Sequence, residues 1–395
     1  MTFIRDLQKV LRENLREYGM FIALFVIMAI FTITTKGLFL SARNLSNLVN
    51  QTGYIAVLAV GMTLVIIIRH IDLSVGFLAG FLGAIAAIAL VFWHLPIYVV
   101  LPMVLALGVV AGSITAFLVT QMGIPAFVAT LAGWLIYRGA ILIVTVSTGT
   151  IIIPDETFNA IGNGFIPDIP GLAGFLPGVH KLTVLLGLVA VILFIVNAIN
   201  GRRAKQKYNF EVLPVSMFIV QLVFMTAVVA GVTWVFASYQ GLSWTAVVVL
   251  VVVLVYDFMM GQTVLGRHIY AVGGNPEAAQ LSGINVKRIT YVVFGSMGML
   301  SGLSGILFAS RLRSATTTAG TLFELDAIAA AFVGGVSAAG GVGKVVGSIV
   351  GALVMLSLTS GMNLMSIDIA YQYAVRGAVL AAAVIFDVAT RRQAR

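Results

Sequence analysis

Long apolar stretches separated by short polar breaks dominate the pattern of the chain. A membrane helix needs about 20 mostly apolar residues, because lipid offers no water to backbone N–H and C=O groups. The sequence predicts twelve spans, at about 18–35, 53–70, 74–93, 97–120, 125–146, 182–200, 214–237, 244–261, 289–310, 326–342, 345–362 and 371–389. We therefore expect an all-α polytopic membrane protein with a single transmembrane domain over 1–395. Within 53–93, two full spans and one broken helix are both compatible with the pattern.

Composition supports a membrane protein and excludes several soluble classes. Charged residues make up 9% of the 395 residues, whereas a soluble globular chain carries about 25%. So few charges cannot cover a soluble surface, which excludes a soluble enzyme, a nucleic-acid binder and a disordered chain. The chain has no Cys, so disulfides, Cys-ligated metals and thiol catalysis are excluded.

The basic residues predict the orientation in the membrane. Fourteen of the 23 lie in four blocks, which are Arg5, Lys9, Arg12 and Arg16; Arg202, Arg203, Lys205 and Lys207; Arg267, Lys287 and Arg288; and Arg391, Arg392 and Arg395. Even numbers of predicted spans separate these blocks, so all four face one side, which is the cytoplasm. The connection 147–180, which has acidic but no basic residues, falls on the other side. We expect a bacterial inner-membrane protein with both termini in the cytoplasm, and we interpret the net charge of +9 as topology.

The N-terminal stretch 1–17 is expected to form an amphipathic cytoplasmic leader. Apolar residues alternate at helical spacing with the four basic ones, which suits a helix lying on the inner membrane surface. The basic region is too long for a cleaved signal peptide, and no small-residue cleavage site follows.

A faint internal echo links 71–80 with 338–347, which indicates two weakly related halves. Both stretches join apolar segments at a break, and both end in a small-xxx-small pattern, Gly76/Gly80 and Gly343/Gly347. Transporters often consist of related halves with interrupted helices at the pathway. The alternative is that such patterns arise by chance in a Gly-rich chain and mark close helix packing only.

Signatures of catalysis and of nucleotide or metal binding are missing. The histidines have no metal-ligand spacing, and no serine-hydrolase or metalloprotease motif occurs. Gly343-Lys344 is not a phosphate loop, because Val345 replaces the required Ser or Thr. No metal or cofactor is expected, and any ATPase activity must belong to another subunit.

The loop 262–288, which we call the coupling loop, contains the most informative motif. Asn275 is placed to cap a short helix with Pro276 at its first position, and Glu277 adds first-turn charge that suits the helix dipole. Gly283 is expected to end this helix. A capped helix projecting into the cytoplasm is typical of a docking element, although an ordinary loop helix has the same pattern.

Glu277-Ala278-Ala279-x-x-x-Gly283 resembles the docking loop of permeases in ATP-binding-cassette (ABC) importers, and other stretches resemble the branch that imports monosaccharides such as ribose, xylose and galactose. The stretches are Gly61-Met62-Thr63, Ile71-Asp72-Leu73-Ser74-Val75-Gly76, 124–132 with Arg138-Gly139, and 324–330 with Gly334-Gly335 and Gly340-Gly341-x-Gly343. The resemblance runs from Asn44 to Asp387. It departs from the broader importer consensus in lacking the Ile-x-Leu-Pro that usually follows the loop.

The resemblance implies a sugar importer in which this chain forms the pathway. A cytoplasmic ABC ATPase subunit docks on the coupling loop, a periplasmic or extracellular binding protein delivers the sugar, and two permease copies pair. The docking residues are then Arg267, Asn275, Pro276, Glu277, Ala278, Ala279 and Gly283. The chain is about 70 residues longer than typical members, with the excess between about 147 and 243. This longer form resembles the xylose permeases of the branch, so D-xylose is the expected sugar.

Polar groups near the apolar segments are candidates for the translocation path. They are Asn44, Asn47, Gln51, Asp72, Ser74, Thr130, Arg138, Glu324 and Asp326. A charge near hydrocarbon is costly and is usually paired or functional. Structural interpretations compete: Asp72 pairs with Arg69 and caps the helix from Ser74, and Arg138 pairs with a carboxylate or carbonyl.

Two further structural interpretations concern other candidates. Thr321 and Glu324 form a capping box, with Asp326 adding first-turn charge. Asn44, Asn47 and Gln51 share one face of an interfacial helix. Trp134 is expected to anchor or pack rather than to stack on sugar.

Two other functions compete with the ABC importer. An ion-coupled secondary sugar transporter would use Asp72, Asp257 or Arg138 as coupling groups. An intramembrane enzyme is disfavoured by the missing motifs.

Overall fold

The computed structural model describes residues 15–146, 149–170, 176–210 and 212–393. Within these residues the chain forms fifteen α-helices, α2 to α16, one short 3-10 helix, η1 (Leu38–Leu40), and two short strands. The prediction of an all-α polytopic fold is confirmed. The first fourteen residues of the predicted leader lie outside the described residues; residues 15–17 begin α2.

Most predicted spans correspond to helices. Eight described helices are long and apolar enough to cross a membrane: α3 (Ala42–Ile67), α5 (Ile97–Thr120), α6 (Ala126–Thr145), α8 (Lys181–Lys207), α9 (Val215–Ala237), α10 (Trp244–Gln262), α13 (Val286–Leu312) and α15 (Val345–Leu364). Shorter apolar stretches occupy most of α2 (Leu15–Thr34), α4 (Val75–Val91) and α16 (Ile369–Gln393).

The predicted span at 326–342 is wrong. The helix there, α14 (Phe323–Val333), has 11 residues, which gives a length of about 16 Å, roughly half the hydrocarbon thickness. It stops at Gly334, where a glycine-rich loop begins that runs to Lys344. Apolar composition at 326–342 suggested a span because Ala, Gly and Val are compatible with both a helix and a tight loop.

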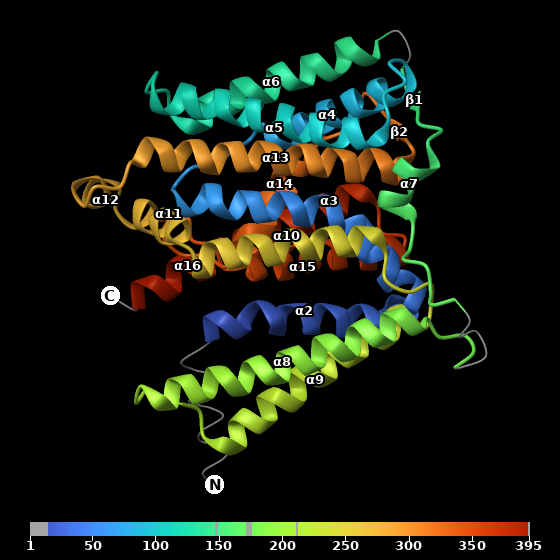
Figure 1. Cartoon of the computed structure of the whole chain (residues 1–395), viewed down its shortest axis with the longest axis vertical. Coiled ribbons are helices and arrows are strands. Elements are labelled where there is room, and N and C mark those ends of the chain that lie inside the picture. Colours follow the sequence, from blue (N-terminus) through green and yellow to red (C-terminus); the bar gives the residue numbers. More distant parts are fainter. Residues whose placement is uncertain (1–14, 147–148, 171–175, 211, 394–395) are drawn as a thin grey trace. The chain divides into compact units, whose positions relative to one another are not determined.

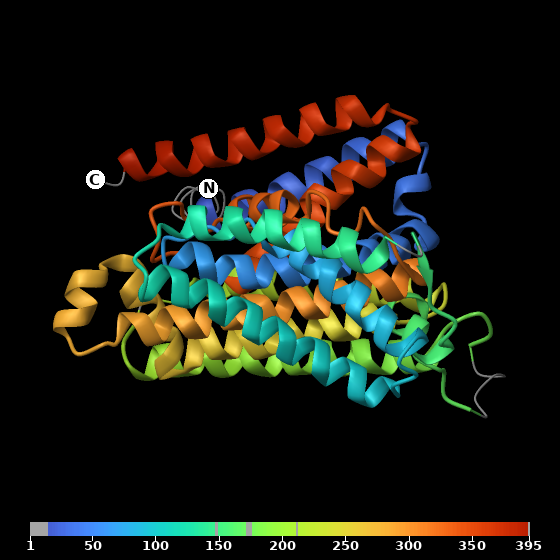
Figure 2. The same ribbon diagram turned by 90° about the horizontal axis from the view of Figure 1, so that it is seen from above.

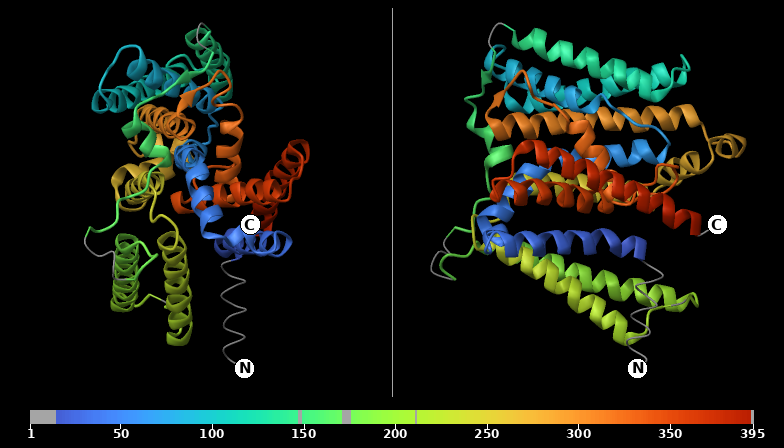
Figure 3. Two further views of the ribbon diagram at one scale, coloured as in Figure 1. Left: turned by 90° about the vertical axis from the view of Figure 1, so that its right-hand side faces the viewer. Right: turned by 180° about the vertical axis from the view of Figure 1, so that it is seen from behind.

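The chain separates into two compact units. The described residues of unit 1 are mainly Leu40–Asn47 and Phe165–Ser243, and unit 2 contains Arg16–Phe39, Leu48–Gly164 and Trp244–Arg395. Unit 2 is a helical bundle with α3 and α13 in its interior, as the end-on view in the left panel of Figure 3 shows. In the 18-residue apolar segment of α3, 89% is buried inside the protein, whereas in that of α6 only 17% is buried. The helix α3 therefore packs against protein, whereas α6 exposes apolar side chains at the surface of the unit.

Glycines bring α13 close to α4 and α5. A β-carbon added at Gly108 of α5 would lie 2.2 Å from the carbonyl oxygen of Gly298 of α13. One added at Gly305 of α13 would lie 2.2 Å from the oxygen of Ala79 on α4. Small residues let helix backbones approach in this way, which is how helices commonly associate in membranes.

The two ends of unit 2 differ. At one end α11 (Val264–Gly274) and α12 (Pro276–Leu281) project beyond the neighbouring helices (Figure 2). At the other end lie α7 (Glu156–Asn163) and the antiparallel pair of β1 (Ile151–Ile152) with β2 (Ser314–Ala315) (Figure 1). The sequence pattern did not predict α7 or the strands, because two-residue strands and one eight-residue helix lack a readable period.

Unit 1 is built around the hairpin of α8 and α9. Most of the apolar surface of both helices is exposed within the unit, which suits contact with lipid. His180 caps α8, and Asp168 supports the same helix start: its Oδ1 accepts from the backbone N–H of Leu182 at 2.9 Å, and its Oδ2 lies 3.5 Å from Lys181 Nζ. Desolvation raises the pKa of Asp168, but hydrogen bonds from the backbone N–H groups of Leu182, Ile169 and Lys181 and the positive potential of His180 outweigh it, so the net pKa is lowered.

Candidate coupling and pathway sites

The coupling loop contains two helices with well-defined caps. Thr263 caps α11 by accepting from the N–H of Gly266 at 3.2 Å. Asn275 ends α11 and caps α12, where its Oδ1 accepts from Ala278 N–H at 3.1 Å and Pro276 takes the first position. Gly283 follows at φ +82° in the left-handed region, which glycine adopts without steric cost. The predicted capped helix and its glycine stop are confirmed.

Most docking candidates face outward. Arg267, Asn275, Glu277, Ala278 and Gly283 are exposed. Pro276 is half-buried, whereas Ala279 is 4% exposed and packs into the apolar core of unit 2. The small side chain of Ala279 thus fixes α12 to the bundle while its neighbours remain available to a partner.

Leu281, the last residue of α12, is 91% exposed. A large apolar side chain at the tip of a projecting helix is suited to insertion into a partner surface. Sequence reasoning missed this residue. Its position on the face opposite the buried Ala279 was the available signal.

A second group of polar residues lies along α6, inside unit 2. Thr130, Trp134 and Arg138 are four residues apart, which places them on one face of the helix; we call them the α6 stripe. Thr130 Oγ1 lies 3.3 Å from the carbonyl oxygen of Ile71, and Arg138 Nη1 donates to that of Thr317 at 2.9 Å. The stripe therefore joins α6 to the chain before α4 and to the chain before α14.

The central contact of the stripe involves Glu324 on α14. Trp134 Nε1 donates to Glu324 Oε1 at 3.0 Å, and the indole packs edge-on against Phe77 of α4 at 4.8 Å between ring centroids. The guanidinium of Arg138 lies 5.0 Å from the Phe77 ring centroid. Glu324 is 4% exposed, and its Oε2 has no hydrogen-bond partner among the described residues. Trp134, which we expected to anchor or pack, packs against Phe77 and is also the direct partner of the path candidate Glu324.

Asp72 and Ser74 form a turn in the loop between α3 and α4. Asp72 Oδ1 accepts from the backbone N–H of Ser74 at 2.9 Å and from its hydroxyl at 2.6 Å. Asp72 is 3% exposed. The expected ion pair with Arg69 is wrong within the described residues, because the Arg69 guanidinium donates to the carbonyl oxygens of Gly273 and Gly274. The expected cap of α4 is also wrong, because the N-cap residue is Ser74, which makes no side-chain cap, and the Asp72 carboxylate instead stabilises the turn before the helix.

The start of α14 differs from the sequence interpretation. Its N-cap is Leu322 at φ +65°, with no side-chain cap, and the Thr321 hydroxyl donates to Thr318. The predicted capping box is therefore wrong. Glu324 is bound to Trp134 instead, and Asp326 pairs with Arg376 of α16 at 3.2 Å.

Asn44, Asn47 and Gln51 occupy the first turns of α3. The expected separate interfacial helix is wrong, because α3 runs without a break from Ala42 into the span. Gln51 is exposed, and among the described residues it makes no hydrogen bond with the α6 stripe. Asn47 and Asn44 are half-buried.

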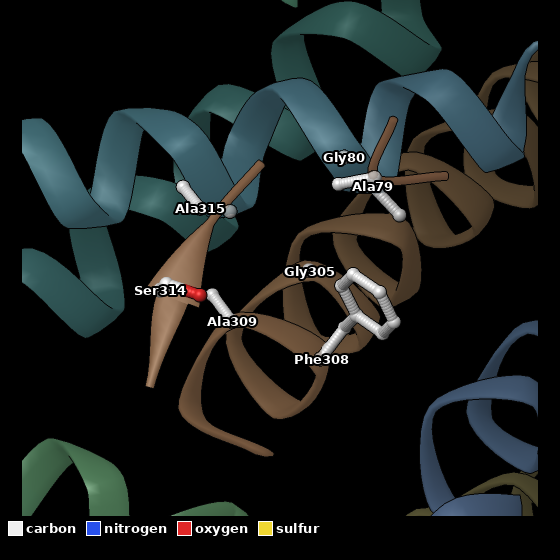
Figure 4. Close-up of a pocket in the computed structure, with 9 residues that line it drawn as sticks. Ala79, Gly80, Gly305, Phe308, Ala309, Ser314 and Ala315 are labelled. Atoms are coloured by element: carbon white, nitrogen blue, oxygen red, sulfur yellow. The ribbon is translucent and has the colours of Figure 1, made fainter. Parts of the chain in front are cut away.

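A small pocket lies where α4, α13 and β2 meet (Figure 4). It has no room for a water-sized molecule, and its lining is Ala and Gly apart from Phe308 and Ser314. A sugar needs several paired donors and acceptors, so this pocket is not a sugar site. Among the described residues no group of three His, Asp or Glu side chains is arranged to hold a metal ion.

Comparison with known proteins gives the class of this membrane protein. The family model for the permease component of branched-chain amino acid transport systems matches residues 44–384. The chain therefore belongs to this family of multi-pass permease components.

Curated relatives cover nearly the whole chain. It is 39% identical over 381 residues to a xylose transport system permease protein of Haemophilus influenzae, spanning 96% of this chain and 98% of the relative. The xylose transport system permease protein of Escherichia coli is 40% identical over 384 residues, spanning 96% and 93%. The ribose import permease protein of Haemophilus influenzae is 35% identical over 375 residues, spanning 94% and 93%. No solved structure matched.

Family membership decides between the competing functions. Members are ABC permease components, so the ion-coupled transporter is wrong as an alternative. The relatives are transport permeases and not enzymes. The prediction of an ABC permease subunit is confirmed.

Proposed function

We propose that this chain is the permease subunit of an ATP-driven D-xylose importer. The observation that carries the sugar assignment is the identity of 39–40% to two xylose permeases over nearly their full lengths, compared with 35% to the ribose permease. The coupling loop supports the ATP-driven part, because its exposed capped helix is built to meet a partner.

The ATPase subunit binds α12 of each permease copy, and two copies form the pathway. Leu281 enters a groove on the ATPase, while Glu277 and Ala278 lie along its rim. The short helix suits this task because its caps hold it rigid and Ala279 fixes it to the core of unit 2. Preorganisation of this kind lowers the entropic cost of binding.

The coupling loop faces the cytoplasm, and α7 faces the side of the sugar-binding protein. Three basic residues, Arg267, Lys287 and Arg288, mark the coupling-loop end. The C-terminal end of α16 lies at the same end of unit 2 (Figure 1), which agrees with the basic residues that close the chain. The pathway runs beside the α6 stripe, whose Trp134 and buried Glu324 bond to each other and support the packing of unit 2.

The test is uptake into proteoliposomes that contain the permease, with its ATPase subunit and binding protein. We expect labelled D-xylose to enter only when ATP is supplied on the ATPase side, and unlabelled D-ribose to compete less well than D-xylose. Uptake driven by an ion gradient through the permease alone contradicts the proposal. Stronger competition by D-ribose retains the importer but rejects the sugar.

The docking surface has its own test. Leu281→Ser should release the ATPase subunit from the purified complex while the permease remains folded. Leu312→Ser is a matched control, since Leu312 is also an exposed leucine but lies at the end of α13, away from the coupling loop. Equal retention of the ATPase by both variants counts against docking at α12.

A further inference from the structure

Three segments that are distant in sequence meet where α11 ends. They are the end of α3 at Ile67, the last residues of α11 at Gly273 and Gly274, and the loop after α14 at Gly340 and Gly341. The N–H of Gly341 donates to the oxygen of Ile67 at 2.9 Å. Figure 1 and the right panel of Figure 3 show the end of α3 beside α11.

Arg69 lies at the centre of this junction. It adopts φ +65°, which is rare for a residue with a side chain, and this reversal turns the chain directly after α3. Its Nε donates to the Gly273 oxygen at 2.7 Å, and its Nη2 donates to the Gly274 oxygen. The last carbonyls of a helix lack partners inside the helix and carry its negative dipole end, so a forked cation is well matched to them.

The backbones are too close for other residues. A β-carbon at Gly273 would lie 1.9 Å from the Ile67 oxygen and 2.7 Å from the Gly341 nitrogen. One at Gly340 would lie 2.4 Å from Arg69 Cγ and 2.7 Å from the Gly273 oxygen. This close contact resists movement of one segment toward another, whereas movement apart is resisted by the hydrogen bonds that join the segments.

A second bond joins α11 to the same glycine-rich loop. The Tyr270 hydroxyl donates to the Gly343 oxygen at 2.7 Å. Burial first, and then the negative charge of Asp257, raise the pKa of Tyr270, so the phenol keeps the proton that it donates. Tyr270 lies one turn before the carbonyls that Arg69 binds, which makes the end of α11 a two-point attachment.

Both loops continue into the interrupted part of the bundle. Two residues after Arg69, the Ile71 oxygen faces Thr130 of the α6 stripe, and Asp72 begins the turn into α4. The other loop follows α14, which contains Glu324, and leads into α15. The junction thus connects the coupling loop directly to both helix breaks, the two stretches that echo each other in sequence.

We propose that Arg69 is the positioning residue that transmits movement of the coupling loop to the two helix breaks and thereby couples ATP hydrolysis to sugar movement. This role rests on the proposed function, because it assumes that an ATPase moves α12. Arg69 itself contacts neither sugar nor ATP. Without its fork, α11 moves with the ATPase while the loops 68–74 and 334–344 lag behind.

The experiment measures D-xylose transported per ATP hydrolysed in proteoliposomes with the complete complex. For Arg69→Gln we expect this ratio to fall by at least about fivefold, the lower end of typical coupling between sites, while ATPase binding and ATP turnover stay within about twofold of wild type. Arg69→Lys keeps the charge but loses the forked pair of donors, so its ratio of D-xylose to ATP should lie between those of wild type and Arg69→Gln.

Arg313→Gln is the matched control. Arg313 also has a positive φ, at +54°, and also ends a helix, but it lies at the far end of α13 from the coupling loop, and its guanidinium forms an exposed 3.8 Å ion pair with Glu156. We expect its ratio to equal that of wild type. If the ratio falls equally in Arg69→Gln and Arg313→Gln, the loss comes from removing any arginine at a left-handed position, and the proposal is overturned.

The remaining outcomes are decisive. A wild-type complex without ATP-driven uptake rejects the proposed function, whereas a working wild type with an unchanged ratio in Arg69→Gln rejects this inference alone. A parallel fall of transport and ATP turnover also rejects it, because Arg69 then only caps α11. If Arg69→Gln does not reach the membrane, Arg69→Lys and Tyr270→Phe decide, and unchanged ratios in both overturn the proposal.

Discussion

The coupling loop and the α6 stripe are assembled in opposite ways. In the coupling loop, Asn275 caps a helix three residues away and the functional side chains remain exposed. In the stripe, Trp134 bonds to Glu324, 190 residues away, and Glu324 is buried. The coupling loop is therefore a preorganised surface, whereas the α6 stripe is part of the packing that holds unit 2 together. Changes in the stripe should reduce stability, and changes in the loop should reduce partner binding first.

The largest effect is expected where α4 meets the chain before α14. A β-carbon at Gly76 would lie 2.1 Å from Glu324 Oε2 and 2.6 Å from the Gly320 oxygen. Gly76→Val should therefore destabilise the permease by about 3 kcal/mol, the upper range for overpacking. Thermal unfolding in detergent measures this. Gly139→Ala on α6 is the control, because nothing lies within 4 Å of its added β-carbon; equal melting of both variants contradicts the close packing.

Removal of the indole donor should have the next largest effect. Trp134→Phe keeps the ring contact with Phe77 but removes the side-chain donor to the buried Glu324 carboxylate, which should cost about 2 kcal/mol. Combined with Glu324→Gln, the two changes should not add, since they break one interaction. Additive losses in the same unfolding measurement would show that the bond contributes nothing.

The same contrast explains how far sequence reasoning reached. The caps of α11 and α12 were predictable because each depends on residues within one turn, such as Asn275 and Pro276. The spans were predictable because apolar length alone decides them. The region of α14 was not, since Ala, Gly and Val in 326–342 suit both a span and a loop; the pair Gly334-Gly335, with Gly335 at φ +86°, was the local stop signal that the prediction passed over.

The partners in the stripe were beyond reach for a related reason. Thr321 and Glu324 have the spacing of a capping box, but the Glu324 carboxylate accepts a hydrogen bond from the indole of Trp134 and does not cap α14. Proximity in sequence suggested that Arg69 pairs with Asp72. In the structure Arg69 binds the carbonyl oxygens of Gly273 and Gly274, which have no partner within α11. The four-residue spacing of Thr130, Trp134 and Arg138 was the one available sign of a common face.

A smaller loss of stability, with a large loss of uptake, is expected at Gly283. Its φ of +82° disfavours any residue with a side chain, so Gly283→Val should cost about 1–2 kcal/mol locally and displace α12 from its docking position. ATP-driven uptake should be lost while the melting temperature hardly changes. Gly283→Asn should retain uptake because Asn tolerates this conformation. If Gly283→Val lowers the melting temperature as much as Gly76→Val does, the coupling loop is part of the core packing and does not differ from the α6 stripe in this respect.

The smallest effect is expected from the cap of α12. Asn275→Ala removes the acceptor for Ala278 N–H, which should cost about 1 kcal/mol of helix stability and, because α12 is exposed and short, leave global unfolding unchanged. The ATPase then binds a helix that is folded for a smaller fraction of the time, so its apparent affinity should fall about fivefold. Titration of the ATPase subunit onto the purified permease measures this. Asn275→Asp restores a capping oxygen and should restore affinity. If it does not, Asn275 contacts the ATPase itself, and its role in the coupling loop is recognition instead of preorganisation.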